Sequence, residues 1–364
     1  MPTSSASRRL ALAIACLGLA GVARAQFQVT LPANLDNTLY QEATGAVSNA
    51  KGQYLFTGNT LAGSLRRALL SFDVGGAIPA GSQITSVRVV LSMNMTIAAA
   101  TPVHLHRCTA SWGEGTSQAL GNEGQGAPAT TGDATWVHRS FNTSNWTTVG
   151  GDFAATASAT QQVGGNGSYT WGPAAGLTAD VQGWLDNPST NFGWIVLGDE
   201  LATTTAKRFG SREHLTASER PRLIVDFTPP PATVTPTGQG CTTSSTQPLT
   251  LSAVGLPTIP NPNFAWRAAG APPSTGVVNV LGLGLLASPF PLNANCGLWL
   301  NPTAIFFQFA GVTDATGQAT YPLPLPNNPQ FLGFRFDAQA VGLDLGQPGG
   351  ALVSSNALSM YLGR

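Results

Sequence analysis

The amino-acid sequence predicts an all-β protein made of two sandwich domains. Its 364 residues include 42 glycines and 26 prolines, whereas charged residues make up only 9%. Gly and Pro set the backbone angles of tight turns, and the Val and Thr residues that recur between them suit pleated strands. A chain of this length can form two domains, each with its own core. We therefore expect a two-sheet antiparallel β-sandwich followed by a second, smaller β-sandwich.

The first 25 residues have the pattern of a secretory signal peptide. Arg8 and Arg9 precede an apolar run that ends in Ala23-Arg24-Ala25, a small-x-small cleavage signal. The run is too short to anchor the protein in a bilayer, and no other segment has the length of a membrane span. A lipoprotein signal at Cys16 is a weaker alternative, because the three residues before it make a poor lipobox. We expect cleavage near Ala25 and a secreted, extracellular or cell-surface protein.

The strands of the first domain, residues 26–228, are predicted by alternation of apolar and polar side chains. The segments RALLSFDV, ITSVRVVLSMNM and RPRLIVDF each place alternate apolar residues on one face. One helical turn is predicted in LTADVQGWLDNP, where Thr178 can cap the start and Asn187-Pro188 ends it. Strands and loops make up the rest, which favours two packed antiparallel sheets.

A Pro-rich stretch at residues 229–240 marks the domain boundary. The sequence FTPPPATVTPTGQG, residues 227–240, excludes a helix and a central strand, and it is typical of a semi-rigid extended linker. Residues 241–364 alternate short apolar runs with turns and contain no His. They resemble an all-β domain found at the C-terminal ends of secreted bacterial proteins, which implies an accessory or surface-association role.

Three cysteines follow the signal peptide. Cys241 and Cys296 lie in the same C-terminal segment. An exported chain meets an oxidising environment, so we predict a disulfide between these two residues. Cys108 is then a free thiol.

The segment VHLHRC offers weak candidates for a metal site. If Val103 and Leu105 face the core, then His104, His106 and Cys108 point the other way. Imidazole and thiolate ligands at such spacing can bind Zn²⁺ or Cu²⁺, but a structural zinc site needs a fourth ligand. A strand with partly exposed His and a semi-buried free Cys is the preferred interpretation, and we expect no metal.

Nine motifs in residues 36–228 resemble those of the DNRLRE domain, also described as carbohydrate-binding module family 96. The resemblance implies a jelly-roll-like β-sandwich of secreted bacterial proteins that binds alginate or related glycans without catalysis. The usual catalytic partner domain is missing from this chain. In order, the motifs are Asp36-Asn37, RRALLSFDV, ITSVRVVLSM, HRCTASWGEGT, GDATWVHRSF, WTTVGGDF, LTADVQGWLDNPSTNFGWIVL, FGSRE and RPRLIVDF.

Glycan binding suggests a set of candidate site residues. Sugars stack their C–H faces on indole rings, and their hydroxyl groups pair with planar polar side chains. Trp184 and Trp194 are expected in the core, whereas other Trp residues border loops. An acidic glycan would also need cations. The candidates are Trp112, Glu114, Trp136, Trp146, Lys51, Arg66 and Arg67.

The sequence argues against nucleic-acid binding and leaves two alternatives to glycan binding. The net charge is zero and no basic block exists, so a nucleic-acid partner is not expected. The main alternative is a structural or adhesive cell-surface protein that binds another protein. A weaker one is a polysaccharide-degrading enzyme. Its carboxylates would come from Glu114, Asp152, Asp180 and Glu213, none of which lies in a hydrolase motif.

We expect no cofactor other than a possible structural calcium ion. Its oxygen ligands would come from Asp36, Asp152 or Asp226, although no EF-hand-like spacing supports such a site. The expected partner is a polysaccharide or cell-surface glycan.

Overall fold

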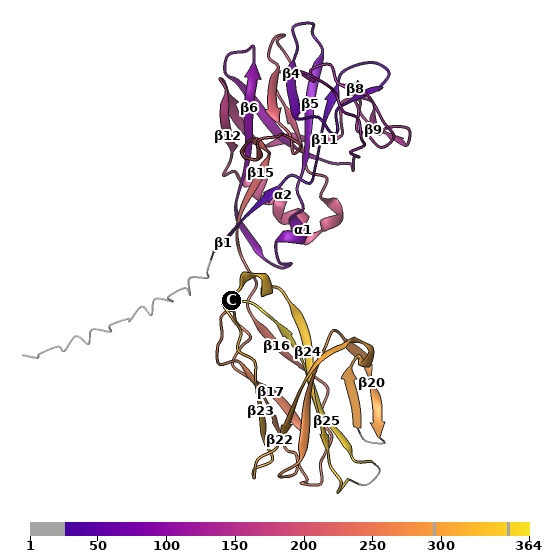
Figure 1. The fold of residues 1–364 in the computed structure, drawn as a ribbon, viewed down its shortest axis with the longest axis vertical. Helices are drawn as coiled ribbons and strands as arrows, with labels where there is room; N and C mark the ends of the chain where they lie inside the picture. Colours follow the sequence, from indigo (N-terminus) through magenta and orange to yellow (C-terminus); the bar gives the residue numbers. More distant parts are fainter. Residues whose placement is uncertain (1–25, 294–295, 348–349) are drawn as a thin grey trace, which may run out of the picture.

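The computed structural model describes residues 26–293, 296–347 and 350–364. The predicted signal peptide lies outside these residues. The chain is mostly strand and forms two β-sandwiches, each around its own apolar core, as the sequence predicts (Figure 1). Within the described residues, no helix is long and apolar enough to cross a membrane.

The first sandwich is a single sheet that curls over on itself. The strand order is β1-β15-β6-β14-β4-β5-β13-β7-β11, with β12 beside β6 and β2 beside β5. Two short pairs, β3 with β8 and β9 with β10, lie outside this sheet. The strands of the domain are β1 (Phe27–Pro32), β2 (Leu35–Tyr40), β3 (Val47–Ser48), β4 (Tyr54–Asn59), β5 (Leu65–Ser71), β6 (Gln83–Thr96), β7 (Thr101–Cys108), β8 (Ala127–Pro128), β9 (His138–Ser140), β10 (Ser144–Asn145), β11 (Phe153–Val163), β12 (Gly167–Trp171), β13 (Trp194–Leu197), β14 (Lys207–Gly210) and β15 (Arg222–Thr228).

The main core lies between the two halves of this sheet. The predicted alternation is confirmed in β6, where Val87, Val89, Leu91 and Met93 are buried, and it ends at Met95, which is exposed. Burial of alternate apolar side chains is what holds the register of such strands. Trp184 and Trp194 are both buried, with ring centroids 4.5 Å apart, and this confirms their predicted place in the core.

Two helices cover one end of this core, α1 (Val74–Ala77) and α2 (Ala175–Asp186). The predicted cap of α2 is wrong. The helix begins three residues before Thr178, and its N-cap, Ala174, makes no side-chain cap hydrogen bond. Gly176 allows this early start because a Cβ atom there would lie 2.5 Å from the carbonyl oxygen of Ser158 on β11.

The second sandwich packs a five-stranded sheet against a three-stranded sheet. The orders are β16-β25-β24-β19-β22 and β17-β18-β23, and β20 and β21 form a separate hairpin. The strands are β16 (Thr233–Thr237), β17 (Thr250–Val254), β18 (Ala265–Ala269), β19 (Gly276–Gly282), β20 (Leu285–Asn293), β21 (Cys296–Leu300), β22 (Ile305–Val312), β23 (Ala319–Pro322), β24 (Arg335–Leu343) and β25 (Leu352–Tyr361).

The predicted linker is only partly a linker. Residues 233–237 form the edge strand β16, which pairs with β25 and places Pro236 opposite Leu358. An edge strand tolerates Pro because one of its sides needs no ladder hydrogen bond. The connection between the domains is therefore shorter than expected, and the domains also touch: the Tyr361 hydroxyl donates to the carbonyl of Ala80 at 3.0 Å.

The cysteine prediction is confirmed. Cys241 and Cys296 form a disulfide in the second sandwich, and Cys108 is free and buried.

Candidate functional site

The three loop tryptophans do not form a sugar-stacking surface. Trp112, Trp136 and Trp146 are at most 9% exposed and form a second apolar cluster on the outer face of β2, β5 and β13. The indole nitrogens of Trp112 and Trp146 donate to the carbonyls of Phe192 (2.8 Å) and Thr135 (2.9 Å). Stacking on a sugar needs an exposed ring face, so the assignment of these residues as glycan contacts is corrected to a structural role.

Arg67 is also occupied inside the protein. Its guanidinium group pairs with the carboxylate of Glu200 at 2.7 and 2.8 Å and lies 4.8 Å from the ring centroid of Trp136. A bidentate pair fixed over an indole ring leaves little donor capacity for a ligand. Arg67 therefore links β5 to residues 109–152, the loop-rich segment that covers the outer face of β2, β5 and β13.

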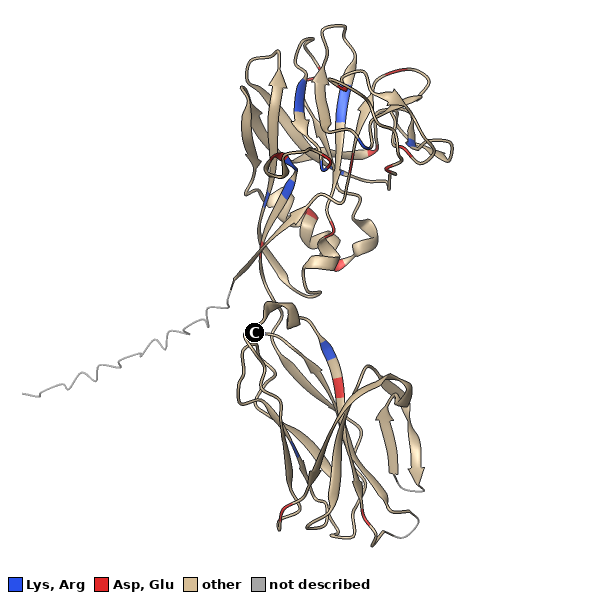
Figure 2. Ribbon diagram, viewed as in Figure 1, with Lys and Arg blue, Asp and Glu red and all other residues tan. Residues whose placement is uncertain are grey.

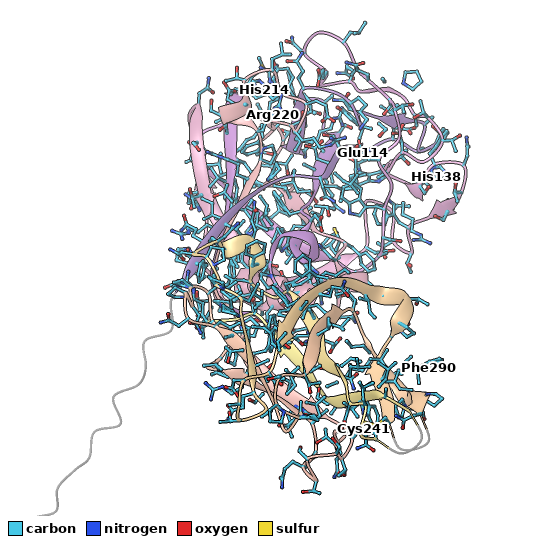
Figure 3. The ribbon with its side chains drawn as sticks, turned by 60° about the horizontal axis from the view of Figure 1, so that its bottom comes forward. Glu114, His138, His214, Arg220, Cys241 and Phe290 are labelled. Atoms are coloured by element: carbon cyan, nitrogen blue, oxygen red, sulfur yellow. A yellow bond between two sulfur atoms is a disulfide. The ribbon has the colours of Figure 1, made fainter. Side chains whose placement is uncertain are left out.

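Glu114 and Lys51 belong to a charged cluster with Arg212 and Glu213. The Lys51 ammonium donates to Glu114 at 2.5 Å, and Arg212 pairs with both Glu114 and Glu213. The Glu114 side chain is only 3% exposed. Figure 3 shows Glu114 within the body of the first domain. The cluster is an internal ion network, so Glu114 is not placed to meet a glycan.

Asp36 adds a third carboxyl group to this network. Its Oδ2 accepts a hydrogen bond from the backbone of Arg212 at 2.7 Å, while its Oδ1 and Oε2 of Glu213 have no partner in the described residues. Burial and then the charge of Glu213 raise the pKa of Asp36 well above its ordinary value. Burial also acts to raise the pKa of Glu114, but hydrogen bonds from Arg212 and Lys51 outweigh it and lower that pKa.

Arg66 differs from the other predicted residues, because it lies beneath an open hollow. This rim hollow, about 370 Å³, is formed by the loops around β2, β4 and β5. Arg66 is 6% exposed, stacks 4.8 Å from the ring centroid of Tyr40, and donates to the carbonyl of Gly124. The hollow is lined by Tyr40, Gln41, Glu42, Val47, Thr60, Leu61, Ala62, Ser64, Arg66 and Gln125.

A second hollow of about 230 Å³ adjoins the first and shares Arg66 with it. Lys207 and Arg208 also line this basic hollow. The Lys207 ammonium donates to the carbonyl of Ala99 at 3.2 Å, and the Arg208 guanidinium lies 3.7 Å from the ring centroid of Tyr54. Sequence reasoning missed both residues, because they lie in a short strand, β14, without a recognisable motif.

The three cations of the two hollows have no carboxylate partner among the described residues. Ion pairs involve Lys51, Arg67, Arg88, Arg107 and Arg212, but neither Arg66, Lys207 nor Arg208. Burial lowers the pKa of both Arg66 and Lys207. Since desolvation of an unpaired charge costs free energy, an anion in these hollows would be favoured.

The candidate metal ligands lie on one face of β7, as the alternation predicts, but each has a different neighbour. Nδ1 of His104 is 2.8 Å from Oγ1 of Thr160, and Nδ1 of His106 is 2.9 Å from the carbonyl oxygen of Ala154. Burial, followed by the nearby His106, lowers the pKa of His104, and burial raises the pKa of the Cys108 thiol. In the part of the chain that the structure describes, no group of three or more His, Cys, Asp or Glu residues is arranged to hold a metal ion.

The acidic residues considered for catalysis or calcium binding are engaged by protein groups. Asp152 accepts hydrogen bonds from the backbone of Thr147 and Thr148. Asp180 accepts from Ser158 and Trp194. It lies in the middle of α2. Asp226 pairs with Arg88 at 2.5 Å.

A larger hollow of about 760 Å³ lies where the two domains meet, and it contains no predicted site residue. Its lining includes Arg335, Asp337 and Tyr361. Asp337 is occupied by hydrogen bonds from Gly284 and Ser359. Most charged residues of the described chain lie in the first domain (Figure 2), where all the predicted site residues also lie.

Comparisons with known proteins give no functional assignment. No family model and no curated protein matches the chain. The structure of the Macrobrachium rosenbergii nodavirus aligns with 99% of this chain and 96% of its own, with 8% identity and a TM-score of 0.19. A beta-1,2-glucanase from Parabacteroides distasonis aligns with 93% of this chain and 37% of its own, with 9% identity and a TM-score of 0.15. Neither likeness is strong enough to support an argument.

Proposed function

We propose that this is a secreted, non-catalytic glycan-binding protein whose first sandwich recognises an acidic polysaccharide at the rim and basic hollows. The observation that carries the proposal is that Arg66 and Arg208, which have no carboxylate partner in the described residues, both line the basic hollow, and that Arg66 also lines the adjoining rim hollow. A carboxylate-bearing sugar would supply the missing counter-charge.

The lining of the rim hollow suits a saccharide chain in other respects. Gln41 and Gln125 are exposed and present planar amides, which can both donate to and accept from hydroxyl groups. Leu61 is exposed at the shared edge of the two hollows and can contact the apolar face of a sugar ring. Together the hollows form a short groove with polar, cationic and apolar parts, as glycan recognition requires.

The test is a binding titration of the mature chain, residues 26–364, with alginate oligosaccharides and with a neutral β-glucan. We expect binding to alginate alone, weakened by salt because the contacts are ionic. Arg208→Gln should weaken the affinity about tenfold, the effect of losing one charge-assisted hydrogen bond.

Arg139→Gln is the matched control. Arg139 also lacks a carboxylate partner in the described residues, but it donates to Ser111 and lines neither hollow. Its variant should bind as the wild type does. Equal binding of Arg208→Gln and the wild type, or binding of the neutral glycan alone, would reject the proposed site.

Adhesion to another protein is the second candidate function. It is favoured by a separate observation, the exposed apolar residues Ile305, Phe306 and Phe307 on β22 of the second domain. Isolated apolar residues are common on protein surfaces, but a contiguous run on one strand indicates an interface.

A further inference from the structure

The strand β22 is an open sheet edge: Phe306 is an extra residue in the pairing with β19 at its start, and the regular part, residues 307–312, carries no protecting device. It is the terminal strand of the five-stranded sheet and pairs only with β19 among the described strands. Its sequence, IFFQFAGV, contains neither a charged residue nor Pro. Ile305, Phe306 and Phe307 are 39%, 51% and 53% exposed, so both faces of the strand present apolar side chains to solvent.

The opposite edge of the same sheet is protected. There β16 carries Pro236, whose missing N–H prevents regular pairing with a further strand. Proteins usually block free edges with Pro, Lys or a bulge, because an open edge offers unpaired backbone donors and acceptors to another strand. The contrast within one sheet indicates that β22 is an edge kept open for a partner strand.

We infer that β22 pairs with β22 of a second copy of this chain. The strand is uncharged, and the second domain, residues 241–364, contains three Asp and three Arg, so two copies of this domain meet without net repulsion. A different protein would usually be selected by charge complementarity, and this strand offers no charge for such selection. Self-pairing requires only what the strand has, which is a free backbone edge and apolar side chains.

The pairing has a defined geometry. Two antiparallel copies of β22 related by a two-fold axis join the two five-stranded sheets into one continuous sheet. Phe306 and Phe307 are 51% and 53% exposed and would be covered by this pairing.

Analytical ultracentrifugation of the mature chain at increasing concentration tests the inference. We expect a monomer–dimer equilibrium. Phe306→Lys places a charge in the apolar surface that the pairing would cover, and it should raise the dissociation constant at least about tenfold. Leu345→Lys is the control, since Leu345 is 83% exposed but lies outside β22, and its dimer should persist. Circular dichroism and thermal unfolding check that both variants fold.

Cross-linking tests the identity of the interface independently. Gln308 is exposed near the middle of β22, so a cysteine placed there can react. Cys108, the free thiol of the wild-type protein, is buried and would not compete. Gln308→Cys should therefore form a disulfide between copies under mild oxidation, and adding Phe306→Lys should prevent it. A wild-type chain that stays monomeric at every concentration, or a dimer unaffected by Phe306→Lys, would overturn the inference.

Discussion

At the scale of single residues, the first domain contains two kinds of cation: those that pair with a carboxylate within the fold and those that do not. Arg67 and Arg212 are held by carboxylates. Arg66 and Arg208 have only backbone, hydroxyl, amide or aromatic partners in the described structure. Arg66 and Arg67 looked equivalent in the sequence, because the position of a carboxylate partner depends on contacts between distant segments. Arg67 and Glu200, for example, are 133 positions apart.

The buried Asp36 carboxyl group predicts a pH dependence of stability. Because burial and Glu213 raise its pKa in the folded state, the folded protein holds this proton more tightly than the unfolded chain does. This group therefore stabilises the fold less as pH rises from about 4, the ordinary Asp value, through its raised pKa. Asp36→Asn removes this loss, so the variant should gain stability relative to the wild type as pH rises.

The free energies of unfolding of both proteins, measured in urea from pH 4 to pH 8, give this difference directly. Groups with lowered pKa values that lie outside this network, such as Glu42, contribute to both proteins and cancel in the comparison. A constant difference across this range would show that Asp36 titrates at the same pH in the folded and unfolded states.

At the scale of elements, the long connection between β7 and β11 is a structural cover rather than a binding loop. The sequence placed its tryptophans beside Gly-rich and polar segments, which are typical of exposed loops. The fold turns them inward because the outer faces of β2, β5 and β13 carry Leu39, Leu69 and Ile195, which require a cover of their own. Alternation within each strand did not reveal this second core, because strands buried on both faces have no polar side.

Trp146→Ala tests the structural role of this cover. The substitution should lower the free energy of unfolding by about 3–5 kcal/mol, as expected for removal of a buried aromatic side chain. Leu120→Ala changes an exposed residue of the same connection and should alter stability by less than about 0.5 kcal/mol. Chemical unfolding of the three proteins measures both values. A Trp146→Ala protein of normal stability that has lost alginate binding would restore this residue to the site.

At the scale of the whole molecule, the sequence predicted the architecture better than the site. Turn residues and strand alternation depend on local chemistry, so the two sandwiches, their boundary near residue 230 and the Cys241–Cys296 disulfide were accessible from the sequence. Of the candidate site residues, only Arg66 lines a hollow assigned here to glycan binding. Lys207 and Arg208 reach it because β14 inserts between β4 and β6, a strand order that the sequence does not encode in any motif.

Hydrogen exchange of the mature chain with and without alginate oligosaccharides tests the central claim most directly. The rim and basic hollows are formed by residues 40–42, 60–66, 95–97, 124–125 and 206–208. If an acidic glycan binds there, amide exchange in these segments should slow, while exchange in the Trp-containing cover should stay unchanged. Protection confined to the cover or to the second domain, or no protection at saturating ligand, would contradict the account.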